Sequence, residues 1–206
     1  YITYMSGATN LVTGDTNAVD DIFLYDRITA ATTRVNVATG GAQVVGDHST
    51  APSVSNDGRY ITFQTGAANL VPGDANGTND IFLHDLVTGT TTRINLAPNG
   101  TEAVGGGSYS SAISADGRYI TYESGATNLV TADTNNSVDV FLIDRSTGIT
   151  SRVSVTSGGG QVGGASYRPR ISADGRCISF ASQSGDLVSG DTNTSTDVFV
   201  RDQGTS

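Results

Sequence analysis

The chain repeats itself with a period of about 59 residues, and this repetition constrains its fold more than any other feature. The segment Tyr1-Ile2-Thr3-Tyr4 recurs in similar form at residues 60–63, 119–122 and 177–180, at offsets of 59, 59 and 58 residues. The 206 residues therefore hold about three and a half units. We place these units approximately at residues 1–50, 51–109, 110–167 and 168–206.

Each unit predicts four short strands. A first strand such as residues 110–114 ends in an Asp-Gly turn, and a second strand such as residues 60–64 follows at once. A long loop leads to a third strand such as residues 80–85, and a Thr-Gly turn reverses the chain into a fourth. The fourth strand alternates polar and apolar residues, as in Arg93-Ile94-Asn95-Leu96, which predicts an outer strand with its polar face in solvent. No segment has a helical period, so we expect an all-β fold.

Four antiparallel strands repeated head to tail are typical of a β-propeller blade. The motifs Ser-x-Asp-Gly-Arg-Tyr (residues 55–60 and 114–119), Ile-Phe-Leu-x-Asp and Thr-Thr-Arg-Ile resemble the TolB-type, WD-like propeller repeat of bacteria over the whole chain. The longer loop Asn-Leu-Val-x-Gly-Asp-x-Asn resembles a variant found in large secreted or envelope proteins. The resemblance implies a single β-propeller, or part of one, over residues 1–206 in a secreted or envelope protein. It implies no reaction.

The two ends of the chain supply incomplete blades. Residues 1–37 predict strands two to four of a blade, and residues 168–202 predict strands one to three. The chain is then either a fragment or processed product of a longer array, or a protein whose incomplete edge blades pair in a homodimer. The absence of an initiator Met or a signal peptide favours the first interpretation.

The Asp-x-Asn loop carries the strongest chemical signal. It has Asp at position one, Asn at position three and Asp at position seven, and Ca²⁺ binds six to eight such oxygens on a flexible turn. The predicted ligands are Asp15, Asn17, Asp21, Asp74, Asn76, Asp80, Asp133, Asn135, Asp139, Asp191, Asn193 and Asp197. The loop lacks the Gly and Glu of an EF-hand, and the same residues form Asx-turns without metal, so both interpretations stay open.

Positions at which the units differ are candidates for ligand binding, because the blade itself does not dictate them. Around the first strand, which lines the central channel of a propeller, these are Tyr109, Tyr167, Arg168 and Arg170. The two arginines share a strand parity and could meet an anion or an acidic neighbour. The tyrosines could stack on a sugar or serve only in packing.

Composition excludes several classes of protein. A net charge of −9 disfavours a nucleic acid partner. No apolar run reaches the roughly 18 residues of a membrane span. The single cysteine rules out an intrachain disulfide. His48 is expected in a loop and His84 on the surface, and no Gly-x-Ser-x-Gly elbow or P-loop is present, so the sequence gives little sign of an enzyme.

These patterns predict a non-enzymatic, extracytoplasmic propeller module that binds or displays a protein or glycan ligand and is stabilised by calcium. A lectin-like carbohydrate-binding propeller is the first alternative. The second is a polysaccharide-active enzyme with its site in the central channel, for which Arg168, Arg170, Tyr167 and His48 are the candidates.

Overall fold

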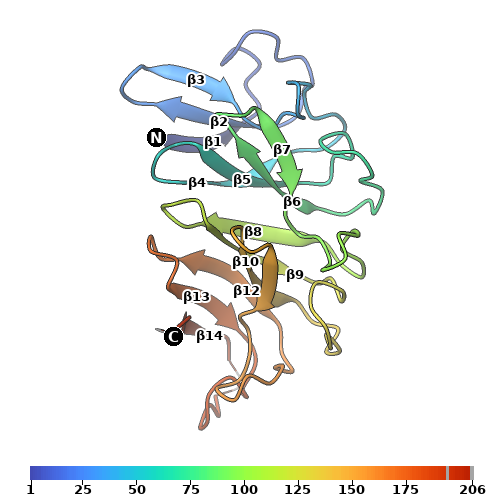
Figure 1. The fold of residues 1–206 in the computed structure, drawn as a ribbon, viewed down its shortest axis with the longest axis vertical. Coiled ribbons are helices and arrows are strands. Elements are labelled where there is room, and N and C mark those ends of the chain that lie inside the picture. Colours follow the sequence, from blue (N-terminus) through green and yellow to red (C-terminus); the bar gives the residue numbers. More distant parts are fainter. Residues whose placement is uncertain (194, 205–206) are drawn as a thin grey trace.

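The computed structural model describes residues 1–193 and 195–204. Residues 194 and 205–206, which belong to the fourth repeat unit, lie outside the described residues. Within that part of the chain every regular element is a β-strand, and the strands form four antiparallel sheets that follow one another in chain order along the long axis (Figure 1). No helix of the described residues is long and apolar enough to cross a membrane.

Each sheet corresponds approximately to one repeat unit, although the first strands of the second, third and fourth sheets begin one or two residues before the expected boundaries at residues 51, 110 and 168. The first contains β1 (Ile2–Ser6), β2 (Asp21–Asp26) and β3 (Ala31–Arg34), and the second contains β4 (Thr50–Val54), β5 (Tyr60–Thr65), β6 (Asp80–Asp85) and β7 (Thr90–Arg93). The third contains β8 (Ser108–Ile113), β9 (Tyr119–Ser124), β10 (Asp139–Asp144) and β11 (Ile149–Arg152), and the fourth contains β12 (Ser166–Ile171), β13 (Cys177–Ser182) and β14 (Asp197–Asp202). The predicted three-stranded end blades and four-stranded middle blades are confirmed.

The hydrophobic core lies between successive blades. Ile81 and Leu83 on β6 belong to the same buried cluster as Ile120 and Tyr122 on β9 of the next blade. Equivalent clusters join the first blade to the second and the third to the fourth. Each sheet therefore buries its faces against its neighbours, which is why the period-2 pattern of the strands repeats in every unit.

The first strands β4, β8 and β12 contact one another in sequence, and each contains a β-bulge. The bulge places Ala51, Ser110 and Arg168 at φ of 52°, 57° and 55°, in the left-handed region. An extra residue in a strand interrupts the alternation of side chains between its two faces. The expectation that Arg168 and Arg170 point the same way because they share a parity therefore loses its basis.

The fourth strand differs from its prediction. Strands β3, β7 and β11 end at Arg34, Arg93 and Arg152, and the polar residues that follow do not face solvent. Asn36, Asn95 and Ser154 are all fully buried. The reason is that the strand stops at the arginine and the chain turns inward, so that these polar side chains meet buried carboxylates of the same blade.

His84 is buried and not on the surface as the sequence predicted. Only 4% of the residue is exposed, and its Nδ1 lies 2.9 Å from Thr91 Oγ1 on the neighbouring strand β7. Burial lowers the pKa of the imidazole. The equivalent positions of the other units hold Tyr25, Ile143 and Arg201, so a buried histidine at this position is particular to the second blade.

A tyrosine ring of one blade packs on the glycine of the next blade's Asp-Gly turn. A Cβ on Gly117 would lie 2.4 Å from the Tyr60 ring, and one on Gly175 would lie 2.3 Å from the Tyr119 ring. The backbone N–H of Asn56 also donates to Ala115 O, at 2.9 Å, between the second and third blades. Glycine at these turns serves both the positive φ and the close approach of the preceding blade.

We expect Gly117→Ala to destabilise the chain by about 2–3 kcal/mol, because it adds a clash with Tyr60 to the strain of φ +73°. Gly148→Ala is the matched control: its φ is +71° with no atom within 4 Å of the added Cβ, so it should cost only about 1 kcal/mol. Urea unfolding of both variants measures the difference. Equal losses would contradict the role of the tyrosine in joining the blades.

Candidate functional site

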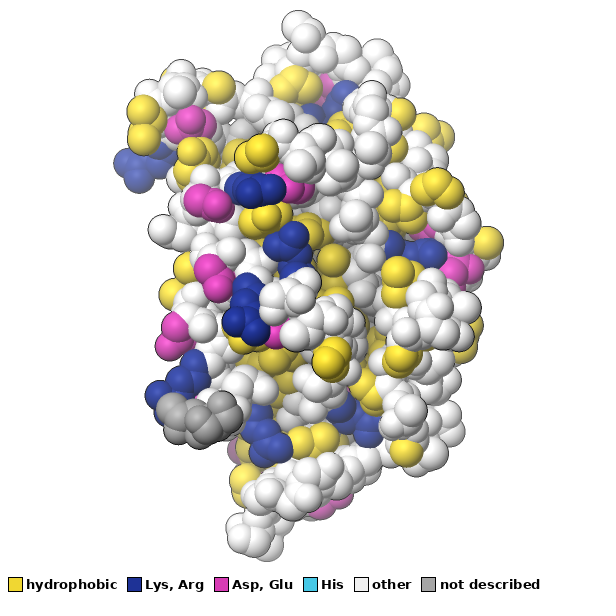
Figure 2. Space-filling model, in the orientation of Figure 1, with side chains coloured by type: hydrophobic (Ala, Val, Ile, Leu, Met, Phe, Trp, Pro, Cys, Tyr) yellow, Lys and Arg dark blue, Asp and Glu magenta, His cyan; other side chains and the backbone are white. Residues whose placement is uncertain are grey.

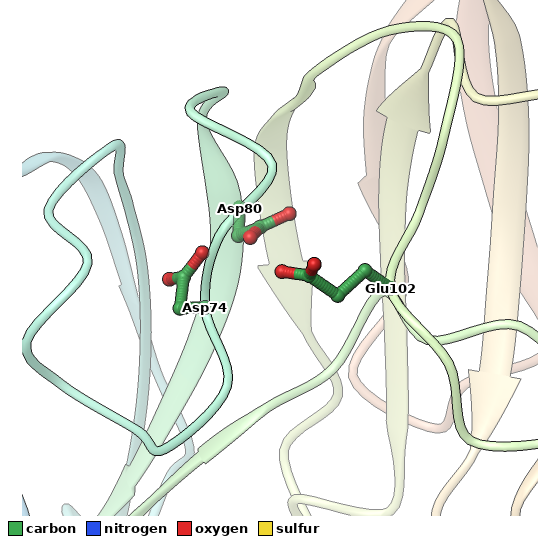
Figure 3. Close-up of side chains that lie close together, drawn as sticks. All are labelled: Asp74, Asp80 and Glu102. Carbon is green, nitrogen blue, oxygen red and sulfur yellow. The ribbon is translucent and has the colours of Figure 1, made fainter.

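Three carboxylates converge beside the long loop of the second blade. Asp74 comes from the Asp-x-Asn loop, Asp80 begins β6, and Glu102 comes from the loop that precedes β8 (Figure 3). Their oxygens lie within 4.8 Å of one another. Such a group of oxygens would suit a cation, and the structure shows which cation the chain itself supplies.

The guanidinium of Arg93, at the end of β7, lies among these carboxylates. Its NH1 is 3.1 Å from Asp74 Oδ1, 3.1 Å from Asp80 Oδ2 and 2.8 Å from Glu102 Oε1. The Arg93 side chain is only 7% exposed. The first and third blades repeat the arrangement, with Arg34 on Asp15 and Asp21, and Arg152 on Asp133 and Asp139, at 3.2 to 3.3 Å.

The loop asparagine presents its amide nitrogen, not its oxygen, to the carboxylate. Asn76 Nδ2 donates to Asp80 Oδ2 at 3.2 Å, while its Oδ1 accepts the backbone N–H of Thr78 at 2.9 Å. The second contact is an Asx-turn, the alternative to metal that the sequence left open. Asn17 and Asn135 make the same pair of contacts in their own loops.

A second amide closes the network. Asn95 Nδ2 donates to Asp80 Oδ1 at 2.6 Å and to Ser108 Oγ at 2.9 Å. Its Oδ1 accepts the backbone N–H of Ile81 at 2.9 Å. Donors from Arg93, Asn76 and Asn95 thus surround the buried Asp80 carboxylate. As arranged, the first three loops do not present an oxygen cage, and calcium there stays a prediction of the sequence.

The fourth loop differs from the other three. Asn193 Nδ2 lies 3.4 Å from Asp197 Oδ1, and Asn193 Oδ1 accepts the N–H of Ser195 at 2.8 Å. Among residues 1–193 and 195–204, no arginine forms a salt bridge with Asp191 or Asp197. In the first three blades that arginine ends the fourth strand, and the described residues of the fourth unit stop before this strand.

Among the three clusters that contain an arginine, charge is least balanced in the second blade, where three carboxylates meet one guanidinium. Burial, followed by repulsion from Asp80, raises the pKa of Asp74 to about 6. The N–H of Ala75, followed by Arg93, lowers the pKa of Glu102. The first and third units have Gln43 and Gln161 in place of Glu102, and the Oε1 of Gln43 accepts the same two kinds of hydrogen bond.

We expect Asp74→Asn to stabilise the chain at pH 8. A carboxyl whose folded pKa is raised contributes stability that is complete below its unfolded pKa of 3.8 and is lost as the pH rises through about 6. Removing the charge should therefore raise the free energy of unfolding by at most about 3 kcal/mol at pH 8, and change it little near pH 4. Thermal melting as a function of pH measures this.

Glu102→Gln is the matched control, because it gives the second blade the residue that the first and third blades have. It keeps the acceptor for Arg93 and removes one negative charge, so the gain from Asp74→Asn at pH 8 should shrink in its background. A gain that is independent of pH, or unchanged in the double variant, would contradict the charge imbalance.

The candidate ligand residues of the first strands lie apart from these loops. Arg168 and Arg170 are both exposed on β12, and within the described residues neither forms a salt bridge, so the predicted pairing with a local Asp is not seen. Arg170 NH1 donates to Pro169 O at 2.8 Å. A cavity of about 180 Å³ is lined by Arg170 together with residues 51–53 of β4 and 110–112 of β8.

The other sequence candidates are engaged in local contacts. Tyr109 is 37% exposed, and its ring lies against Gly107, where a Cβ would be 2.7 Å from the hydroxyl. Tyr167 OH lies 3.1 Å from Thr196 Oγ1. His48 is exposed, and its Nδ1 accepts the backbone N–H of Asp20 at 2.9 Å. These contacts fit the packing interpretation of the tyrosines.

Sequence reasoning missed Glu123 on β9. Its carboxylate accepts the backbone N–H of Arg168 in the next blade and the hydroxyl of Ser110 at 3.1 Å. Gln64 caps the N–H of Ser110 in the same way, at 2.7 Å. One signal was available, since Glu123 is one of only two glutamates and stands where the other units have Met5, Gln64 and Ala181.

Charged groups of both signs share the surface. Figure 2 shows basic side chains next to acidic ones along the left side of the view, and all of the basic ones are arginine because the chain has no lysine. In the second, third and fourth blades an ion pair joins the arginine after the Asp-Gly turn to the end of the third strand, as Arg118–Asp144 does at 2.7 Å. The partner holds the pKa of Asp144 well below its usual range.

Comparison with known proteins identifies the architecture as part of a β-propeller. No family model matches the chain, and no curated protein does so. Among solved structures it is similar to TolB from Acinetobacter baumannii, with 21% identity over 97% of this chain and 37% of that chain and a TM-score of 0.53. A TolB structure from Agrobacterium tumefaciens matches with 15% identity over 98% and 57% of the two chains, at a TM-score of 0.57.

A prolyl endopeptidase matches with 13% identity over 91% of this chain and 25% of that chain, at a TM-score of 0.54. Identities this low show the fold alone, so the fold is a TolB-type β-propeller fold. The chain spans less than two thirds of the length of these similar proteins.

Proposed function

We propose that the chain is a non-enzymatic binding module of a secreted or envelope protein, and that its ligand carries a carboxylate. The observation that supports the proposal most is the pair of exposed arginines, Arg168 and Arg170, on a first strand. The protein has a net charge of −9, and most of its carboxylates form contacts within loops and turns. Among the described residues, no carboxylate pairs with the guanidinium groups of these two arginines. An anionic ligand would supply one.

The shape of the surface fits a small anionic group. The cavity beside Arg170 has a volume of about 180 Å³, which suits one side chain or carboxylate of a larger ligand. The bulges of β4 and β8 border it, and the left-handed φ of Ser110 is held by the side chain of Gln64. Backbone held in such a conformation recurs at binding sites.

Carbohydrate binding and polysaccharide chemistry have less support. The Tyr109 ring lies against Gly107 and the Tyr167 hydroxyl contacts Thr196, which favours packing over sugar stacking, and His48 contacts Asp20. The carboxylate near Arg168, that of Glu123, accepts the backbone N–H of Arg168 and the hydroxyl of Ser110, which favours a structural role over acid/base chemistry. The predicted homodimer stays a prediction, which sedimentation velocity would test.

The double variant Arg168→Ala/Arg170→Ala should weaken binding of a glutamate-rich peptide at least about tenfold, because a charge-assisted hydrogen bond contributes about 1.5–3 kcal/mol. Fluorescence anisotropy of the labelled peptide measures this. Arg201→Ala removes one arginine from β14 and is the control that should have little effect. Equal losses in both variants would indicate non-specific attraction and contradict the site.

Calcium is the remaining part of the sequence hypothesis. In the first three blades an arginine at the end of the fourth strand already balances part of the carboxylate charge of the loop. The ion would therefore act where carboxylates are left unbalanced, which is at Glu102 and in the fourth loop. The hypothesis predicts that EDTA lowers the melting temperature and that added Ca²⁺, but not Na⁺ of equal ionic strength, restores it. A melting temperature that is the same in EDTA and in Ca²⁺ would remove calcium from the proposal.

A further inference from the structure

A groove of about 530 Å³ lies between the second and third blades, where the chain after β7 approaches the hairpin of β10 and β11. Its walls include Ile94, Leu96 and Pro98 of the second blade and Ile143 and Thr150 of the third. Both blades have all four of their strands. The groove is therefore a feature of two complete neighbouring blades.

The edge strand β11 contributes Thr150 to this groove. Further along the same pairing with β10, the N–H of Val153 donates to Val140 O at 2.7 Å. Hydrogen-bonded and non-hydrogen-bonded pairs alternate along an antiparallel ladder, so Thr150, which lies opposite Ile143, is in a non-hydrogen-bonded pair. Its N–H and C=O point away from β10. They are one donor and one acceptor with which an extended segment can pair.

The boundary between the first and second blades shows what such a position takes. Thr91 of β7 is the equivalent of Thr150, and its N–H donates to Thr39 Oγ1 at 3.0 Å, in the turn between β3 and β4. Thr39 Oγ1 in turn donates to Thr91 O at 3.5 Å. One group that both accepts and donates thus covers the strand edge, and only 5% of Thr91 is exposed.

Pro98 stands at the second boundary where Thr39 stands at the first. The two turns close in the same way, because the N–H of Gly41 and that of Gly100 each donate to the C=O three residues earlier, at 2.8 Å. Proline has no hydroxyl group, so Pro98 cannot give Thr150 the contacts that Thr39 gives Thr91. Thr150 is half-buried, and the groove lies open beside it.

Charge and shape select what the groove can bind. Of the described residues that line it, only Arg93 is ionisable, and its guanidinium is already paired with three carboxylates. Ile143 replaces His84 of the second blade, so this wall has no imidazole. A charged group would find no partner here, whereas an uncharged aliphatic side chain would bury its surface against the walls.

We propose that the groove binds an extended, uncharged segment of a partner polypeptide, which pairs with the edge of β11 and places one aliphatic side chain between the two blades. The residue opposite Thr150 accepts the Thr150 N–H and donates its own N–H to Thr150 O. Its side chain lies on the same face of the sheet as those of Thr150 and Ile143. Ile143 packs against the core shared with the second blade, so this side chain enters the groove.

The experiment titrates the whole ¹⁵N-labelled chain with the blocked peptide acetyl-Ser-Thr-Leu-Thr-Ser-amide. The amide signal of Thr150 should shift saturably, and its hydrogen exchange should slow, whereas exchange at Thr91 should not change. A peptide with N-methyl-leucine loses the donor to Thr150 O and should bind about tenfold more weakly. A peptide with Asp in place of Leu should bind at least about tenfold more weakly, because the groove has no partner for its charge.

Pro98→Thr gives the second boundary the residue of the first, so its hydroxyl should cover Thr150 and weaken binding of the leucine peptide about tenfold. Ser157→Thr is the matched control, at the same turn position of the third blade and outside the groove, and should leave the affinity unchanged. Arg168→Ala/Arg170→Ala should also leave it unchanged, which separates this groove from the proposed anionic ligand site.

The comparison of the three peptides needs no variant protein, so it stands even if Pro98→Thr unfolds. Absence of a saturable shift at Thr150 would overturn the proposal. So would equal affinity for the leucine and aspartate peptides, binding that N-methylation does not weaken, or full affinity in folded Pro98→Thr.

Discussion

In each of the first three blades a buried arginine connects the long loop to the third and fourth strands. Arg34, Arg93 and Arg152 each end a fourth strand and bind one carboxylate from the long loop and one from the start of the third strand. The cost of burying these charges is high and is offset only in part, because the Nε of each arginine has no hydrogen-bond partner among the described residues. Here Asn and Ser side chains supply the remaining donors to the strand carboxylate, so the loop takes a defined conformation although it has few apolar residues of its own.

The blades could be predicted from sequence because their signals are local and recur. Asp-Gly turns, alternating strands and the Ile-Phe pair each specify structure within a few residues, and three and a half repeats of them leave little choice of fold. The arginine clusters could not be predicted in the same way. Alternation places Arg93 and Asn95 on the polar side of a strand, which normally faces solvent, and does not reveal that the strand ends at the arginine.

Their partners are also distant, since Asp74 and Asp80 precede Arg93 by 19 and 13 residues. One sequence signal did point to them. In each of the first three units an arginine follows the two aspartates at the same spacing, and the chain has no lysine that could take its place. A planar guanidinium can bind two carboxylates at fixed geometry, and an ammonium cannot. The same reasoning explains why Ca²⁺ was the natural prediction, because the pattern of oxygens shows that a cation is needed without showing which one.

Burial in this molecule depends on neighbours more than on the residues themselves. Val140 and Val198 each stand between an aspartate and a phenylalanine at equivalent positions of two units. Val140 is nevertheless fully buried, whereas Val198 is 76% exposed. In a stack of repeats, each unit contacts only the units beside it. Equivalent residues can therefore differ in exposure between a middle blade and the last described blade. Departures such as His84 and Glu123 have another origin, because each residue occurs in one unit only. His84 lies against Thr91 of its own blade, and Glu123 accepts the N–H of Arg168 as Gln64 accepts that of Ser110. What the repeats share therefore accounts for the propeller fold, and what a single unit adds is where binding by this chain must be sought.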